Sequence, residues 1–145
     1  MQTYQLFREG LLIMNQIFVD TGPLLARYIA ADQFHQRSIK LWDKLNKQPL
    51  ITSNHVTDEF LTLLARRTTY PFAVERASSL YSSQALTVIQ STIEDEKAAI
   101  EYFHKYADSR VSFTDCISFA ICKRLKVKKV FSFDKHFSLC GFKLL

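Results

Sequence analysis

Four carboxylates in this chain stand where an acid is not the usual choice: Asp20, Glu59, Asp115 and Asp134. Two of them follow apolar runs typical of buried strands, and the other two lie early in stretches with a helical pattern. Strand ends and helix starts are the places where an alternating β/α fold gathers its functional groups. Acids converging there repel one another unless a divalent cation lies between them. The four together therefore indicate a cation site.

The chemistry that suits such a site is metal-assisted attack of water on a phosphodiester. Mg²⁺ takes one or two carboxylates directly and keeps several waters, and we expect Asp20 and Asp115 to be those ligands. The metal lowers the pKa of bound water and offsets charge on the scissile phosphate. Glu59 and Asp134 would complete or tune the site. The hydroxyl of Thr21 is placed to bind a metal water or a phosphate oxygen.

Each acid taken singly also has a structural explanation. Asp20 could simply end a strand, and Glu59 could be a helix-surface residue. Asp115 could complete a capping box with Ser112, and Asp134 could cap the turn that follows it. Their joint placement at crossover junctions is what favours a common site.

Periodicity places these acids on alternating strands and helices. Short apolar runs predict four strands and a fifth, edge strand, at 16–20, 49–52, 86–89, 129–133 and 142–145. Helical spacing predicts helices at about 23–29, 33–48, 54–67, 71–83, 92–107 and 113–125. This alternation predicts an α/β fold: a single three-layer domain with a parallel sheet of four to five strands flanked by helices.

The first thirteen residues stand apart from that pattern. Met14 lies just before the first expected strand, and we interpret residues 1–13 as an N-terminal extension upstream of the natural start, with residues 14–145 as the domain. An ordered or frayed N-terminal arm is the alternative.

Composition fits a globular domain with an anionic partner. The 145 residues carry a formal charge of +5, and 48% of them are hydrophobic. No apolar run approaches the roughly 20 residues of a membrane span. The three cysteines, Cys116, Cys122 and Cys140, lack zinc-ligand spacing. We interpret them as buried or half-buried thiols in a reducing, cytoplasmic compartment.

Taken in order, four short runs resemble PIN-domain ribonucleases, a group that includes the VapC-like toxins of toxin–antitoxin pairs. The runs are Ile17-Phe18-Val19-Asp20-Thr21-Gly22-Pro23-Leu24-Leu25, Thr57-Asp58-Glu59-Phe60, Phe113-Thr114-Asp115-Cys116-Ile117 and Val130-Phe131-Ser132-Phe133-Asp134-Lys135-His136-Phe137. The resemblance covers the chain from Met14 to its C-terminus, and the N-terminal arm is its one departure from the commonest toxin form.

That resemblance implies a metal-dependent endoribonuclease that uses Mg²⁺ or Mn²⁺ and has RNA as its substrate. It implies a homodimer and a small antitoxin protein that blocks the site. The four acids would form the metal site. Thr21 and Thr114 match hydroxyl positions common around it, and Ser132 stands where Thr or Ser is usual before the last acid.

Basic and imidazole side chains supply further candidates. Arg66 and Arg67 lie two helical turns after Glu59 and could bind the RNA backbone, although a solvated surface is the alternative. The same two interpretations apply to a lysine-rich cluster at 123–129. We expect His55 to have a polar role at a helix start, and His136 is a weaker candidate for substrate contact.

Other classes with a related fold fit less well. A phosphoacceptor receiver domain needs a second acid beside Asp20 and an Asp after the third strand, where this chain has Gln90-Ser91. A haloacid-type phosphatase needs an Asp where this chain has Gly22. Two alternatives stay open: a PIN-like RNA-binding or regulatory module without catalysis, and a DNA-directed nuclease of the same superfamily.

Overall fold

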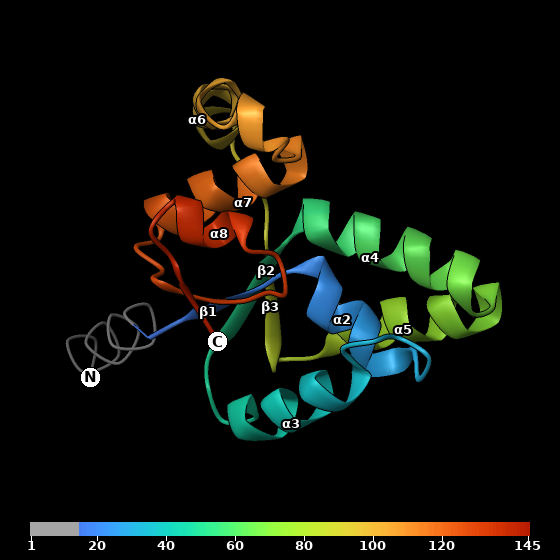
Figure 1. Cartoon of the computed structure of the whole chain (residues 1–145). Helices are drawn as coiled ribbons and strands as arrows, with labels where there is room; N and C mark the ends of the chain where they lie inside the picture. The colour runs from blue at the N-terminus through green and yellow to red at the C-terminus, as the bar shows by residue number, and fades with distance from the viewer. Residues whose placement is uncertain (1–14) are drawn as a thin grey trace, which may run out of the picture.

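Five parallel strands form one sheet in the order β3-β2-β1-β4-β5 in a computed structural model that describes residues 15–145 (Figure 1). The strands are β1 Ile17–Val19, β2 Leu50–Ser53, β3 Leu86–Ile89, β4 Lys129–Phe131 and β5 Lys143–Leu144. The helices are α2 Thr21–Tyr28, α3 His35–Leu45, α4 Asn54–Arg67, α5 Tyr70–Ser82, α6 Ile93–Lys105, α7 Phe113–Arg124 and α8 His136–Leu139, with a 3₁₀ turn η1 at Ala107–Ser109. The predicted α/β class, the parallel sheet and the flanking helices are confirmed.

Helices cover both faces of the sheet, which gives three layers. In Figure 1, α6, α7 and α8 lie together on one side, and α2, α3, α4 and α5 lie on the other. Strand β1 is central and pairs with both β2 and β4. Its residues Phe18 and Val19 are fully buried, as an apolar run sandwiched between two helical layers must be.

Strand order decides where a ligand can bind. The chain passes from β1 outward through β2 to β3, and then crosses back to β4 on the opposite side of β1. The connections after β1 and β4 therefore leave in opposite directions. A crevice forms at such a switch point beyond the carboxyl ends of the two strands, and open α/β sheets bind their ligands there.

Side-chain caps fix where the helices around that crevice begin. Ser53 accepts a hydrogen bond from the backbone N–H of Val56 at the start of α4, and Ser112 accepts one from Asp115 at the start of α7. A capping box formed by Thr92 and Asp95 begins α6.

Several elements are shorter than their patterns predicted, and for two of them a local hydrogen bond accounts for the difference. Strand β4 stops at Phe131, not at 133, because the Ser132 hydroxyl accepts the backbone N–H of Asp134 and turns the chain out of the sheet. Helix α3 begins at His35, not at 33, because the Asp32 carboxylate accepts the N–H of Phe34 in a local turn.

The remaining expectations concern the chain ends and the thiols. The interpretation of residues 1–13, and of Met14 as the natural start, lies outside the described residues. Among residues 15–145, no helix has both the length and the hydropathy needed to cross a bilayer. Cys116 and Cys122 are buried and Cys140 is half-buried, all as free thiols, which confirms their predicted burial.

Candidate active site

A cavity of about 760 Å³ opens at the switch point, beyond β1 and β4. All four acids line it: Asp20 after β1, Glu59 on α4, Asp115 in the first turn of α7, and Asp134 after β4. The structure thus brings together, at one edge of the sheet, the carboxylates that the sequence singled out.

Asp20 is the acid held most firmly by its surroundings. It is 7% exposed, and its Oδ2 accepts a 2.7 Å hydrogen bond from the hydroxyl of Ser132. Burial raises the pKa of Asp20 to about 6, and the charges of Asp134 and Glu59 add to this effect. The hydrogen bonds from Ser132 and from the Thr21 backbone oppose the rise in pKa.

Glu59 is positioned by Thr21 across the cavity. The Thr21 hydroxyl donates a 3.0 Å hydrogen bond to Glu59 Oε2, which joins the first turn of α2 to α4. The sequence suggested that this hydroxyl would face a metal water or a phosphate, and here its proton is directed to Glu59. The carboxylate of Glu59 remains exposed at the cavity.

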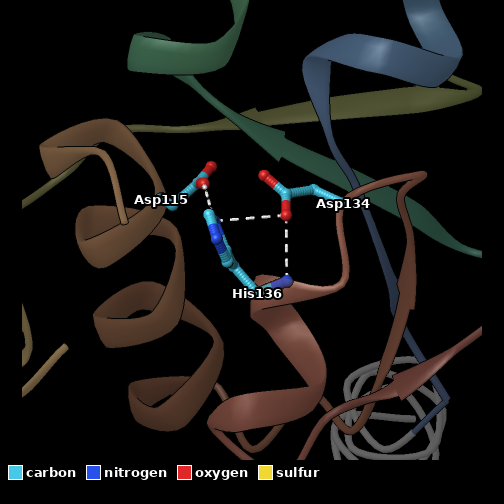
Figure 2. A group of neighbouring side chains, drawn as sticks. All are labelled: Asp115, Asp134 and His136. Atoms are coloured by element: carbon cyan, nitrogen blue, oxygen red, sulfur yellow. Dashed lines mark hydrogen bonds and ion pairs between the residues drawn. The ribbon is translucent and has the colours of Figure 1, made fainter. Parts of the chain in front are cut away.

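Asp115, Asp134 and His136 converge from α7, the turn after β4 and the start of α8 (Figure 2). His136 Nδ1 lies 3.2 Å from Asp134 Oδ1 and 3.8 Å from Asp115 Oδ2. The backbone N–H of His136 also donates to Asp134 Oδ1, at 2.9 Å. One ligand atom from each of these three residues lies within 4.8 Å of the others, close enough to share one cation.

The acids at this edge lie close enough together to affect one another's pKa values. Burial, together with the charges of Asp20 and Asp134, raises the pKa of Asp115 to about 8. Within residues 15–145, neither lysine nor arginine forms an ion pair with any of the four acids; only His136 does. The buried Nδ1 of His136 has no hydrogen-bond partner of good geometry.

This donor set fits a divalent cation. Four carboxylates offer the oxygen ligands that Mg²⁺ and Mn²⁺ accept, and a nearby imidazole suits a transition metal. A cation would also offset the like-charge repulsion that, after burial, contributes to the raised pKa values of Asp20 and Asp115. The three residues whose ligand atoms lie within 4.8 Å of one another include His136 but not Asp20. The expected ligand pair of Asp20 and Asp115 stays a prediction.

The other sequence candidates divide between the cavity and its surroundings. Arg67 lines the cavity, whereas Arg66 and Thr114 are not among its lining residues. His55, in the first turn of α4, accepts or donates a 2.9 Å hydrogen bond with Ser91, in keeping with the helix-start role expected of it.

Two cationic residues that line the cavity were not identified from the sequence. Arg110 precedes α7 in a left-handed backbone conformation, with φ of 54°, a loop geometry that periodicity does not reveal. Lys135 follows Asp134 directly, and its place beside a candidate acid was a signal that could have identified it.

Comparison with known proteins agrees with the fold. Residues 17–143 match the family model described as PIN domain. The chain therefore belongs to the PIN-domain ribonuclease family. Within that family it is similar to proteins of the VapC type, in both sequence and structure.

Two curated relatives show the likeness in sequence. The 23S rRNA-specific endonuclease VapC20 of Mycobacterium tuberculosis is 35% identical over 127 residues, which are 87% of this chain and 95% of that protein. The VapC ribonuclease of Archaeoglobus fulgidus is 31% identical over 130 residues, or 83% of this chain and 78% of that protein.

Two solved structures have a fold similar to that of this chain. The crystal structure of Mycobacterium tuberculosis VapC20, described as a sarcin-ricin loop cleaving toxin, has a TM-score of 0.79 over 87% of this chain and 95% of its own. VapBC2 of Rickettsia felis, bound to a DNA fragment from its promoter, has a TM-score of 0.65 over 90% of this chain and 97% of its own. At 10% identity, that second likeness concerns the fold alone.

Proposed function

We propose that this protein is a metal-dependent endoribonuclease that hydrolyses RNA phosphodiester bonds, and that it is the toxin of a toxin–antitoxin pair. The observation that carries the proposal is the convergence of Asp20, Glu59, Asp115 and Asp134 on one cavity at the switch point. The names of the two curated relatives, an rRNA endonuclease and a ribonuclease, support the choice of substrate.

Asp20 and Asp115 would hold Mg²⁺ or Mn²⁺, and Asp134 and His136 lie close enough to Asp115 to share its cation. Bound there, the cation would activate water for attack and offset charge on the scissile phosphate. The protein's own contribution is to hold the carboxylates at fixed positions. Ser132 fixes Asp20 and the Asp134 backbone, and Thr21 fixes Glu59.

The substrate backbone would be bound by cations at the rim of the cavity. Arg67, Arg110 and Lys135 come from three different segments and line the same cavity as the acids. None of the three forms an ion pair with another described residue, so their charges are available to phosphates. The net charge of +5 acts in the same direction over a longer range.

We further propose a homodimer in the cytoplasm, inhibited by a small antitoxin protein. Similarity in sequence to proteins of the VapC type supports the antitoxin.

Cleavage assays on matched RNA and DNA oligonucleotides would test the proposal. We expect RNA to be cut in Mg²⁺ or Mn²⁺, and cutting to stop when EDTA removes the metal. Cleavage of DNA but not RNA would identify a DNA-directed nuclease instead. RNA binding without cleavage in either metal would identify a non-catalytic RNA-binding module.

A further inference from the structure

Two phenylalanines line the acidic cavity and stack on each other. The rings of Phe34 and Phe133 have centroids 4.4 Å apart and are inclined by 20°, and both residues are half-buried. In the described part of the chain, they are the only Phe, Tyr or Trp residues that line this cavity. The other lining residues near them are largely polar, so this pair is an apolar surface inside a charged site.

The inner ring, Phe133, is fixed by the same segment that positions the acids. Its neighbours in sequence are Ser132, which donates to Asp20, and Asp134 itself. Phe131 packs edge-on against the ring, with centroids 5.9 Å apart and an interplanar angle of 88°. The guanidinium of Arg37 lies 5.4 Å from the ring centroid. Phe133 is therefore tied through its backbone to the segment that positions Asp20 and Asp134.

The outer ring, Phe34, is held by its backbone and not by the core. Its N–H donates a 2.8 Å hydrogen bond to Asp32 Oδ1, and the next residue, His35, makes a 2.6 Å hydrogen bond through Nδ1 to the carbonyl of Ala26. Phe133 packs against the hydrophobic core, whereas Phe34 is not among the core residues or those that pack on them. Burial in the core thus does not account for an aromatic residue at position 34.

We propose that Phe34, backed by Phe133 and Arg37, is a stacking platform for one unpaired base of the RNA next to the scissile phosphate. Phe133 covers one face of the Phe34 ring, and among residues 15–145 no other aromatic ring or cationic side chain stacks on Phe34. Proteins that bind single-stranded RNA stack bases on aromatic rings while cations hold the backbone, and Arg67, Arg110 and Lys135 line the same cavity. The inference rests on the proposed ribonuclease function, because it assigns a subsite within that site.

The platform predicts a preference for RNA that is unpaired at the cleavage position. A base inside a duplex has both faces covered by its neighbours and would have to leave the stack first. Stacking tolerates any base, so the platform requires an unpaired base without specifying which one.

The test measures how tightly a fluorescent single-stranded RNA of about 12 nucleotides binds. The parent protein for this test carries Asp20→Asn, which prevents cleavage of the RNA. Phe34→Leu keeps an apolar side chain but removes the ring, and Phe34→Tyr restores it. Phe103→Leu, in an exposed aromatic pair with Phe113 on the α6–α7 surface, is the matched control. A second series of RNAs carries one abasic ribose at each position in turn.

We expect Phe34→Leu to weaken binding about 5- to 100-fold, the range for loss of one stacked base, and Phe34→Tyr and Phe103→Leu to bind like the parent protein. One abasic position should weaken binding by the parent to the same degree and have no further effect on Phe34→Leu. A merely structural role for Phe34 would instead weaken all the RNAs equally.

The inference is overturned if Phe34→Leu binds intact RNA as the parent does, or if every abasic RNA loses affinity for Phe34→Leu as it does for the parent. Wild-type protein that still cleaves RNA in that case would leave the proposed function standing. Wild-type protein that neither binds nor cleaves RNA would overturn both.

Discussion

The hydroxyl of Ser132 donates a 2.7 Å hydrogen bond to the carboxylate of Asp20, although 112 residues separate them in sequence. Ser132 follows β4 and Asp20 follows β1, and these two strands are neighbours in the sheet. The same hydroxyl accepts the backbone N–H of Asp134. One small side chain therefore sets the positions of two acids at the switch point.

Replacing Ser132 with alanine should loosen both acids. We expect Ser132→Ala to lower metal affinity and RNA cleavage by about 10- to 100-fold, as is typical when a residue that orients metal ligands is lost. The unfolding free energy should fall by about 1–2 kcal/mol, because Asp20 loses a buried hydrogen bond. Titration calorimetry with Mn²⁺ and a cleavage assay would measure these effects.

The control for that variant is Ser38→Ala, which removes another fully buried hydroxyl, one that donates to the Pro23 carbonyl. It should lose stability without a matching loss of metal affinity. If Ser132→Ala and Ser38→Ala had the same metal affinity, Ser132 would have no role in positioning Asp20.

Stability without metal should decrease as the pH rises. Burial and like charges raise the pKa of Asp20 to about 6 and that of Asp115 to about 8, from an ordinary value of 3.8. A carboxyl whose pKa is higher in the folded than in the unfolded chain stabilises the fold while it is protonated. That contribution is complete below pH 3.8 and is lost as the pH rises through about 6 and about 8.

Asp115→Asn should therefore be more stable than wild type in EDTA near pH 8.5, by about 1–3 kcal/mol. Saturating Mn²⁺ should reverse the order, since only the wild type keeps this ligand. Urea denaturation at several pH values would measure both effects, with the exposed Asp108→Asn as the control. If the unfolding free energy of the wild type in EDTA rose between pH 6 and pH 8, the raised pKa values of Asp20 and Asp115 would be contradicted.

Arg67 and Arg66 offer a matched pair for testing contact with RNA. Both are exposed at the end of α4, but only Arg67 lines the cavity. Arg67→Ala should weaken RNA binding and reduce the slope of log affinity against log salt by about 0.7, the value for one phosphate contact on a single strand. Arg66→Ala should leave that slope close to wild type. Equal slopes for both variants would remove Arg67 from the RNA-binding surface.

Asp95 and Arg124 form an ion pair that should stabilise the fold without serving the site. The guanidinium donates two hydrogen bonds, of 2.9 and 2.8 Å, to an Asp95 carboxylate that is 3% exposed and also caps α6. Burial opposes ionisation of Asp95, but the hydrogen bonds from Arg124 and the Thr92 backbone lower its pKa overall.

Asp95→Ala should lower the unfolding free energy by about 2–3 kcal/mol, with the half-exposed Arg124 limiting the loss. Glu75→Ala, which breaks an exposed pair with Arg76, should change it by less than about 1 kcal/mol. RNA cleavage well below the melting temperature should be unchanged in both variants. A large loss of cleavage in Asp95→Ala would contradict the separation of this pair from the site.

The convergence of the acids was predictable because parallel strands end at a common edge. Asp20 ends an apolar run, and Asp134 was placed after another, so a parallel sheet had to bring them near each other. The bond between Ser132 and Asp20 was not predictable, because it depends on β4 pairing with β1. Strand order is set by long-range packing that local periodicity does not contain.

The directions in which side chains point could not be predicted from the sequence either. Arg66 and Arg67 are adjacent on a helix and point about 100° apart, and the sequence could not tell which one faces the cavity. His136 was considered only as a weaker substrate contact. Its place between Asp115 and Asp134 follows from the turn at Ser132, which ended β4 two residues earlier than the apolar pattern suggested.

Cleavage of RNA by wild type, Asp20→Asn and Asp58→Asn in Mg²⁺ or Mn²⁺ tests the central claim most directly. Asp58 is an exposed acid beside Glu59 that does not line the cavity, so it controls for the loss of one charge. We predict that wild type and Asp58→Asn cleave equally, that EDTA stops both, and that Asp20→Asn is slower by about 100-fold or more. Equal cleavage by wild type and Asp20→Asn would contradict the assignment of this cavity as the active site.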